Sequence, residues 1–213
     1  MANQYQSLAI SKPHTVIIMA QGECKRFPNK HSQTIRGIPI LKRTVDILKT
    51  YPCFPIVIGP DTDFFVNIGC HNITLTNPGT GLLDGIHETH DLWVLQGALI
   101  LLGDVVYSRQ LLDIMMNDTR QFVMYARNEP NLYTGRLHGE RYGLRVGIEY
   151  SSYLYDRINW DRWRQHCNGR LQGLWHRIEP KCAWYECDDW TDDVDTPADL
   201  EALRDCCATV EDF

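Results

Sequence analysis

The residues with the clearest chemical potential lie together in one short segment. Met19 to Lys30 reads MAQGECKRFPNK and follows an apolar run, His14 to Ala20, that is typical of a buried central strand. A loop that binds phosphates brings backbone amides close to oxygen, which favours glycine, and neutralises charge with lysine or arginine. Gly22, Arg26 and Lys30 could supply these parts. The alternative is a solvated basic loop between a strand and a helix.

The composition of the chain limits which ligands such a loop could bind. The chain has 213 residues, 44% of them apolar, so we expect one domain over 1–213. The net charge of −6 provides no general attraction for polyanions, and no Lys/Arg run indicates a nucleic-acid or membrane surface. No apolar stretch reaches the roughly 18 residues of a membrane span, and the first ten residues lack signal-peptide features. We therefore expect a cytoplasmic protein that meets any anionic substrate with a few placed cations.

The elements that must position this loop alternate along the chain. Pro39, followed by apolar residues at Leu41, Val45 and Leu48, predicts a helix. The last helix is predicted to begin at Thr196-Pro197-Ala198-Asp199, which offers an N-cap hydroxyl, a proline at the first helical position and an acid at the third. Strands are predicted at Phe54–Gly59, Asn72–Thr76, Ala98–Val106, Phe122–Ala126 and Leu144–Glu149, and further helices at Asp61–Ile68, Leu82–Trp93 and Ser108–Met116. This order predicts an α/β, Rossmann-like fold with a mostly parallel sheet flanked by helices. Ligands in such folds lie beyond the carboxyl ends of the strands, where the Gln21 loop and Asp104 would be.

Three segments together resemble a known family. Met19 to Lys30 resembles the signature loop of the sugar nucleotidyltransferases and their MobA-like relatives, L-A-A-G-x-G-x-R followed by P-K or P-x-K. Its R-F-P-N-K end is closest to the cytidylyltransferases that activate acidic sugars. Leu102-Gly103-Asp104 is similar to the family's strand-end Gly-Asp, and Asp193 to Leu200 resembles its V-D-T-P-E-D-L ending. The resemblance implies a GT-A-like nucleotidyltransferase fold.

The resemblance also implies roles for particular residues. The nucleotide would be approached by Ala20, Gln21, Gly22 and Glu23, its phosphates would be contacted by the catalytic residues Arg26 and Lys30, and Mg²⁺ would be held by Asp104 and Asp195. Magnesium is commonly held by one or two carboxylates together with substrate phosphates, which agrees with two aspartates. Either aspartate by itself could instead be a turn former or a cap.

The implied reaction joins a nucleoside monophosphate from an NTP to a sugar phosphate, or to another phosphorylated or acidic acceptor, and releases pyrophosphate. The expected partners are the NTP and this small acceptor, without nucleic acid or membrane, and a homodimer is left open. Asn77 and Thr80, with Asp84, fall where the family reads the base or sugar, although a Pro-Gly turn with a cap at Thr80 explains them equally. Residues 127–180 are left open as a small acceptor-binding lobe, where Arg127, Arg136, Arg141 and Arg145 could clamp an anion or be solvated.

Residues that differ from the family pattern, and motifs typical of other proteins, allow other interpretations. Gln21 stands where the family has a small residue, and Cys24 stands where it has a second glycine, which supports a noncatalytic nucleotide-binding module. Asp61-Thr62-Asp63 has the Asp-x-Asp form of a GT-A glycosyltransferase that consumes an NDP-sugar, but it begins a predicted helix. The spacing of Cys182, Cys187, Cys206 and Cys207 argues against a zinc site.

Overall fold

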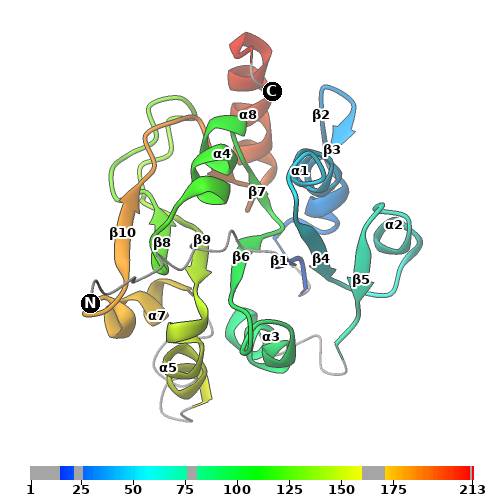
Figure 1. Ribbon diagram of the computed structural model, residues 1–213. Helices are drawn as coiled ribbons and strands as arrows, with labels where there is room; N and C mark the ends of the chain where they lie inside the picture. The colour runs from blue at the N-terminus through cyan, green and yellow to red at the C-terminus, as the bar shows by residue number, and fades with distance from the viewer. Residues whose placement is uncertain (1–14, 22–25, 76–80, 160–170, 212) are drawn as a thin grey trace, which may run out of the picture.

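A seven-stranded sheet runs through the centre of the molecule. The computed structural model describes residues 15–21, 26–75, 81–159, 171–211 and 213. The strand order is β10-β8-β9-β6-β1-β4-β5 (Figure 1). These strands are β1 Thr15–Met19, β4 Phe54–Ile58, β5 His71–Ile73, β6 Ala98–Leu102, β8 Phe122–Ala126, β9 Arg141–Val146 and β10 Ala183–Glu186. The predicted α/β class with a mostly parallel sheet is confirmed.

The sheet contains one reversed strand among those described. β6, β1, β4 and β5 are mutually parallel, and β10 is parallel to β8. β9 runs antiparallel to both of its neighbours, β6 and β8. β1 lies between β4 and β6 and all five of its residues are buried, which explains why its sequence is apolar without alternation.

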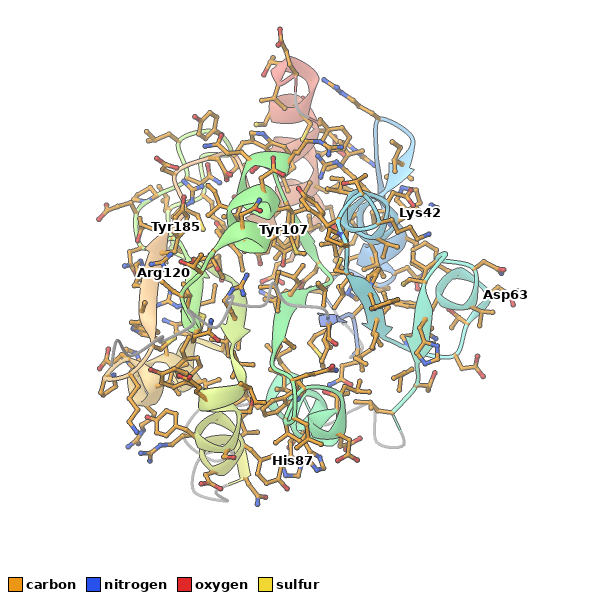
Figure 2. The ribbon with its side chains drawn as sticks, in the orientation of Figure 1. Lys42, Asp63, His87, Tyr107, Arg120 and Tyr185 are labelled. Carbon is orange, nitrogen blue, oxygen red and sulfur yellow. The ribbon has the colours of Figure 1, made fainter. Side chains whose placement is uncertain are left out.

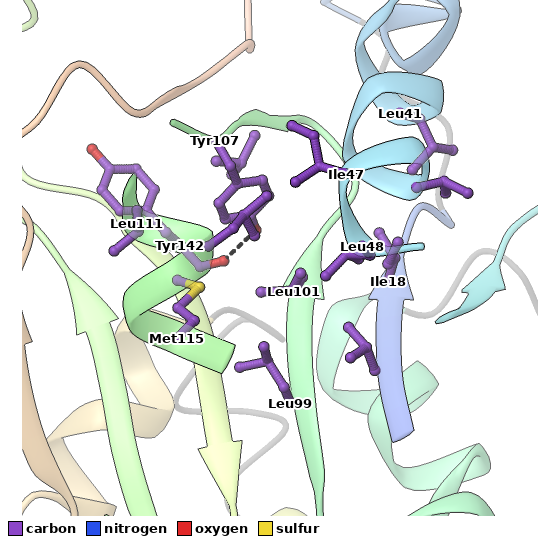
Figure 3. Packing of buried hydrophobic residues seen from close by; sticks show 14 of the residues in the cluster. Ile18, Leu41, Ile47, Leu48, Leu99, Leu101, Tyr107, Leu111, Met115 and Tyr142 are labelled. Atoms are coloured by element: carbon purple, nitrogen blue, oxygen red, sulfur yellow. Dashed lines mark hydrogen bonds between the residues drawn. The ribbon is translucent and has the colours of Figure 1, made fainter. Parts of the chain in front are cut away.

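Helices cover both faces of the sheet. On one face lie α1 Ile40–Leu48 and α4 Arg109–Asn117, and on the other lie α3 Leu82–Glu88, α5 Ile148–Asn159 and α7 Leu171–Ile178 (Figure 1). On the α1 and α4 side, the buried Tyr107 packs among aliphatic side chains, and its hydroxyl donates to the carbonyl of Tyr142 at 2.6 Å (Figure 3). The remaining elements are the short helices η1 Lys30–Ser32, α2 Asp63–Val66 and η2 His90–Leu92, the short strands β2 Thr34–Ile35, β3 Ile38–Pro39, β7 Val105–Val106 and β11 Asp192–Asp193, and the helix α8 Pro197–Thr209.

The predicted Ala98–Val106 strand is divided in two. β6 ends at Leu102, and β7 begins at Val105 after the turn at Gly103 and Asp104. The Gly103 amide donates to the Met19 carbonyl at 2.9 Å, and a Cβ on Gly103 would lie only 2.6 Å from the Ala20 Cβ. This close approach to the end of β1 requires glycine, and it directs the following residues away from the sheet.

Other helix and strand boundaries also differ from those that the sequence predicts. Pro39 precedes α1 as its N-cap and not as its first residue, because its ψ of 139° is extended. The predicted Leu82–Trp93 helix ends at Glu88 and continues as η2. The predicted Leu144–Glu149 strand lies at Arg141–Val146, and α5 begins at Ile148. Within the described part of the chain, no helix is both long enough and apolar enough to span a membrane.

α8 begins with the capping box that its sequence predicts. The Thr196 hydroxyl accepts from the Asp199 amide, and the Asp199 carboxylate accepts from the Thr196 amide at 2.7 Å. The same carboxylate oxygen accepts from the Asp195 amide at 3.1 Å. The start of this helix therefore also fixes the backbone of Asp195.

Replacing the cap residue tests this anchoring. Thr196→Ala removes the acceptor for the Asp199 amide and is expected to lower the free energy of unfolding by about 1 kcal/mol. The matched control is Thr209→Ala at the other end of α8, where the hydroxyl only donates to the Cys206 carbonyl. Urea denaturation of both variants measures the difference, and equal stability would contradict a capping role for Thr196.

Candidate functional site

The centre of the candidate site is one ammonium group held between two carboxylates. Lys30 Nζ donates to Asp104 Oδ2 and lies 3.3 Å from Asp195 Oδ1. The Lys30 side chain is 9% exposed, against 22% for Asp104 and 25% for Asp195. A buried cation therefore contacts two partly exposed carboxylates at the carboxyl end of the central strands.

Backbone pairing brings the two aspartates together. β7 and β11 form an antiparallel pair in which Val105 lies opposite Asp193, and the Val194 amide donates to the Asp104 carbonyl at 2.9 Å. Asp104 directly precedes β7 and Asp195 follows β11, so this small ladder sets their separation. It joins segments that are far apart in the sequence, which a local pattern does not reveal.

The lysine is presented by a tight turn. Asn29 precedes η1 with a φ of 57°, in the left-handed region that asparagine tolerates better than most residues. Lys30 and His31 then point into the molecule, where the His31 ring packs edge-on against Phe65 at a centroid distance of 5.9 Å. Burial lowers the pKa of His31 to about 4, with Asp104 opposing the shift, so this imidazole is neutral at pH 7.

Arg26 completes the charged group from a more open position. Its guanidinium lies 2.8 Å from Asp195 Oδ2, but its side chain is 64% exposed. Burial acts to raise the pKa of Asp195, but Lys30 and Arg26 outweigh it and bring that pKa below its usual value. Asp195 is therefore ionised at neutral pH, the form in which a carboxylate binds a metal ion.

Arg136 is a site residue whose position the sequence did not indicate. Its guanidinium donates to Asp193 Oδ1 and to the Asp193 carbonyl, and lies 3.8 Å from Asp195 Oδ2 and 3.7 Å from Glu140. Burial raises the pKa of Asp193, and Arg136 opposes that rise. Arg136 comes from the middle of the chain, where no motif aligned, so only the tertiary structure connects it with the site.

The other three arginines of that region have different roles. Arg127 and Arg145 are buried, and each donates to a backbone carbonyl, of Asp189 and of Met115 respectively. Arg141 lies over the Trp184 ring at 5.2 Å. Arg127 and Arg145 are therefore buried structural residues and not solvated, whereas Arg141 is partly buried against Trp184.

The predicted nucleotide-binding residues are described only in part. Ala20 and Gln21 lie at the end of β1, and the Gln21 side chain donates to the Gly81 carbonyl at 3.1 Å. Gly22, Glu23, Cys24, Asn77 and Thr80 lie outside the described residues.

The rival motifs occupy other parts of the molecule. Asp61 and Asp63 are exposed at the start of α2, and Asp63 projects at the outer edge beyond β5 (Figure 2). Cys182 and Cys187 pack in separate core clusters, and Cys206 and Cys207 pack in a third. Among the described residues, no three His, Cys, Asp or Glu side chains form a group that could hold a metal.

Comparison with solved structures identifies the fold. No protein-family model matches the chain, and no curated protein matches it by sequence. The solved structures that it resembles include UDP-glucose pyrophosphorylase complexed with UDP-glucose, with a TM-score of 0.66 and 11% identity over 93% of this chain and 100% of that one. CMP-2-keto-3-deoxy-manno-octonic acid synthetase complexed with CTP gives 0.62 and 18% over 93% and 99%. Inositol-1-phosphate CTP transferase from T. maritima gives 0.62 and 12% over 94% and 98%. The chain therefore has the fold of the sugar nucleotidyltransferases.

Removing Arg136 tests whether it neutralises the buried carboxylates. Arg136→Met leaves Asp193 buried beside Asp195 without its cation, and we expect the free energy of unfolding to fall by about 3 kcal/mol. Arg109→Met is the matched control, because Arg109 is exposed on α4 and its replacement should change stability by less than about 0.5 kcal/mol. If urea denaturation gives the same stability for both variants, Arg136 does not have this role.

The buried neutral His31 predicts a pH dependence of stability. Its pKa is about 4 in the folded chain and 6.5 in the unfolded chain, so unfolding takes up a proton between these values. Stability should therefore fall as the pH is lowered from 6.5 towards 4, by about 3 kcal/mol from this group. In His31→Leu this part of the slope should disappear, whereas His138→Leu, at an exposed position, should keep it. Unfolding free energies measured from pH 4 to 7 decide between these outcomes.

Proposed function

We propose that the chain is a magnesium-dependent nucleotidyltransferase that transfers a nucleoside monophosphate from an NTP to a small acceptor and releases pyrophosphate. The acceptor class is a sugar phosphate or a similar phosphorylated or acidic molecule. The observation that carries the proposal is the contact of Lys30 with both Asp104 and Asp195 at the carboxyl end of the sheet. The fold shared with nucleotidyltransferases supports the same assignment.

The donor set at this point fits a magnesium ion. Carboxylate oxygens of Asp104 and Asp195 approach a single cationic atom, and magnesium prefers such hard oxygen ligands together with phosphate oxygens. Two carboxylates are a sufficient protein contribution when a triphosphate supplies the rest. Bound there, the ion would neutralise phosphate charge and hold the triphosphate in place.

The side chains then act by alignment and charge. Lys30 and Arg26 neutralise phosphate oxygens while an anionic oxygen of the acceptor attacks the α-phosphorus in line. The bond between acceptor oxygen and α-phosphorus forms as the bond from α-phosphorus to the β-phosphate oxygen breaks, and pyrophosphate leaves. An anionic acceptor oxygen needs neither a protein nucleophile nor a general base. Arg26 is more exposed than Lys30 and Arg136, so we propose that it contacts the substrate from the open side of the site.

The acceptor is proposed to bind on the side of residues 127–180. Arg136 connects that part of the chain with Asp195, so an acceptor there would lie next to the metal ligands. A cytoplasmic location and a homodimer remain predictions from the sequence.

Alanine variants with matched controls test the assignment. Lys30→Ala and Asp104→Ala should each reduce pyrophosphate release at least 100-fold, because each removes a group that neutralises or aligns the triphosphate. The controls are Lys42→Ala and Asp46→Ala, which break an exposed ion pair on α1 and should keep wild-type activity. The assay combines each of the four NTPs with pooled sugar phosphates and acidic sugars, with and without Mg²⁺.

The same assay has outcomes that contradict the proposal. Folded Lys30→Ala and Asp104→Ala proteins with full pyrophosphate release would overturn the roles given to these residues. Turnover of NDP-sugars in place of NTPs would indicate a glycosyltransferase. Magnesium-dependent NTP binding without pyrophosphate release across the whole acceptor pool would indicate a noncatalytic module.

A further inference from the structure

The ammonium of Lys30 lies where a metal ion between Asp104 and Asp195 would have to bind. Its Nζ donates to Asp104 Oδ2 and lies 3.3 Å from Asp195 Oδ1, so one cationic atom is shared by both carboxylates. Magnesium binds carboxylate oxygens at about 2.0–2.1 Å. An ion on these same two oxygens would therefore lie close to the ammonium nitrogen, and positive charges at such a separation repel each other strongly. Lys30 and the metal ion compete for one place.

The second oxygen of Asp195 also faces cations of the chain. Arg26 lies 2.8 Å from Asp195 Oδ2, and Arg136 lies 3.8 Å from the same atom. Among the described residues, no third acid, histidine or cysteine joins Asp104 and Asp195 in a group that could hold a metal. A divalent ion that arrives alone thus meets two carboxylates whose charge is already neutralised, with no further protein ligand.

Moving the Lys30 ammonium requires another anion to receive it. The side chain is 9% exposed, and a buried ammonium that leaves its carboxylates without a replacement is a costly unpaired charge. The oxygens of a triphosphate supply that replacement, and the flexible stem of lysine lets its donors turn from one acceptor to another. The backbone can stay in place, because the amide and hydroxyl of Ser32 both donate to the Asn29 carbonyl and close the turn around Lys30.

We propose that Lys30 keeps Mg²⁺ out of the two aspartates until a triphosphate binds and accepts its ammonium. This inference rests on the proposed nucleotidyltransferase function and adds a regulation of its metal site, in which the ion enters with the nucleotide and not before it. Without a phosphate, the affinity for the ion is reduced by the small fraction of molecules in which the ammonium has left the carboxylates.

The first test is a calorimetric titration of the chain with Mg²⁺ alone, without nucleotide. Lys30→Met removes the ammonium and keeps an unbranched side chain, so it should bind Mg²⁺ at least about tenfold more tightly than wild type, because no internal cation competes. Lys30→Arg keeps a cation and should bind as weakly as wild type. Equal Mg²⁺ affinity of Lys30→Met and wild type would overturn the inference.

Two control variants separate competition for one place from a change in net charge. Arg26→Met removes a cation from the exposed side of Asp195 and should change Mg²⁺ affinity by less than about threefold, because exposed charges are screened. Lys42→Met removes the exposed partner of Asp46 and should bind as wild type does. A tenfold gain in Arg26→Met as well would assign the effect to net charge and overturn the inference.

A double variant locates the ion. Adding Asp195→Asn to Lys30→Met should abolish the gain in Mg²⁺ affinity, because one of the two shared carboxylates is lost. If the gain persists, the ion binds elsewhere and does not compete with Lys30.

Wild type alone provides a measurement that does not depend on the folding of Lys30→Met. Urea denaturation is followed with Mg²⁺ alone, with each of the four NTPs alone, and with both together. Mg²⁺ alone should leave the midpoint unchanged, whereas Mg²⁺ together with an NTP should raise it above the value for that NTP alone. A midpoint raised as much by Mg²⁺ alone as by Mg²⁺ with an NTP would contradict the exclusion.

Pyrophosphate release separates this inference from the proposed function. If wild type releases pyrophosphate but Lys30→Met gains no Mg²⁺ affinity, only the exclusion by Lys30 fails. If wild type releases no pyrophosphate from any NTP, the proposed function fails, and the titration without nucleotide still decides whether Lys30 and Mg²⁺ compete.

Discussion

The ammonium of Lys30 between Asp104 and Asp195 is the contact on which the arrangement of this site depends. Two carboxylates at half-buried positions repel each other unless a cation lies between them. The three residues come from a turn before η1, a turn after β6 and the end of β11, so the contact ties distant parts of the chain to one strand end. The β7 and β11 ladder and the capping box of α8 hold the backbone that makes this contact.

The three cations around these carboxylates differ in how much they are exposed. The side chains of Lys30 and Arg136 are 9% and 16% exposed, whereas Arg26 is 64% exposed. An exposed ion pair contributes little to stability, while a buried one is costly to break from one side. The buried pairs therefore position the carboxylates, and the exposed arginine is the one most available to a substrate.

The end of β1 separates two chemical environments. On one side, Gly103 lets the turn of Asp104 approach the strand, and the charges gather there. On the other, Gly81 and Gly85 seat the neutral amide of Gln21 against α3. Gly103 and Gly85 matter here because a Cβ at either position would overlap neighbouring atoms of Ala20, or of Gln21 and Met19.

The sequence by itself determined the α/β class, most of the sheet strands, the α8 cap and the candidates Lys30, Asp104 and Asp195, because apolar periodicity, capping and short motifs are local signals. Only the tertiary structure decided the antiparallel direction of β9, the division of the Ala98–Val106 strand and the hydrogen bond from Arg136 to Asp193. Each of these depends on pairing between segments far apart in the chain. Local residue patterns do not encode which distant strand or carboxylate a segment will meet, and packing of the whole sheet makes that choice.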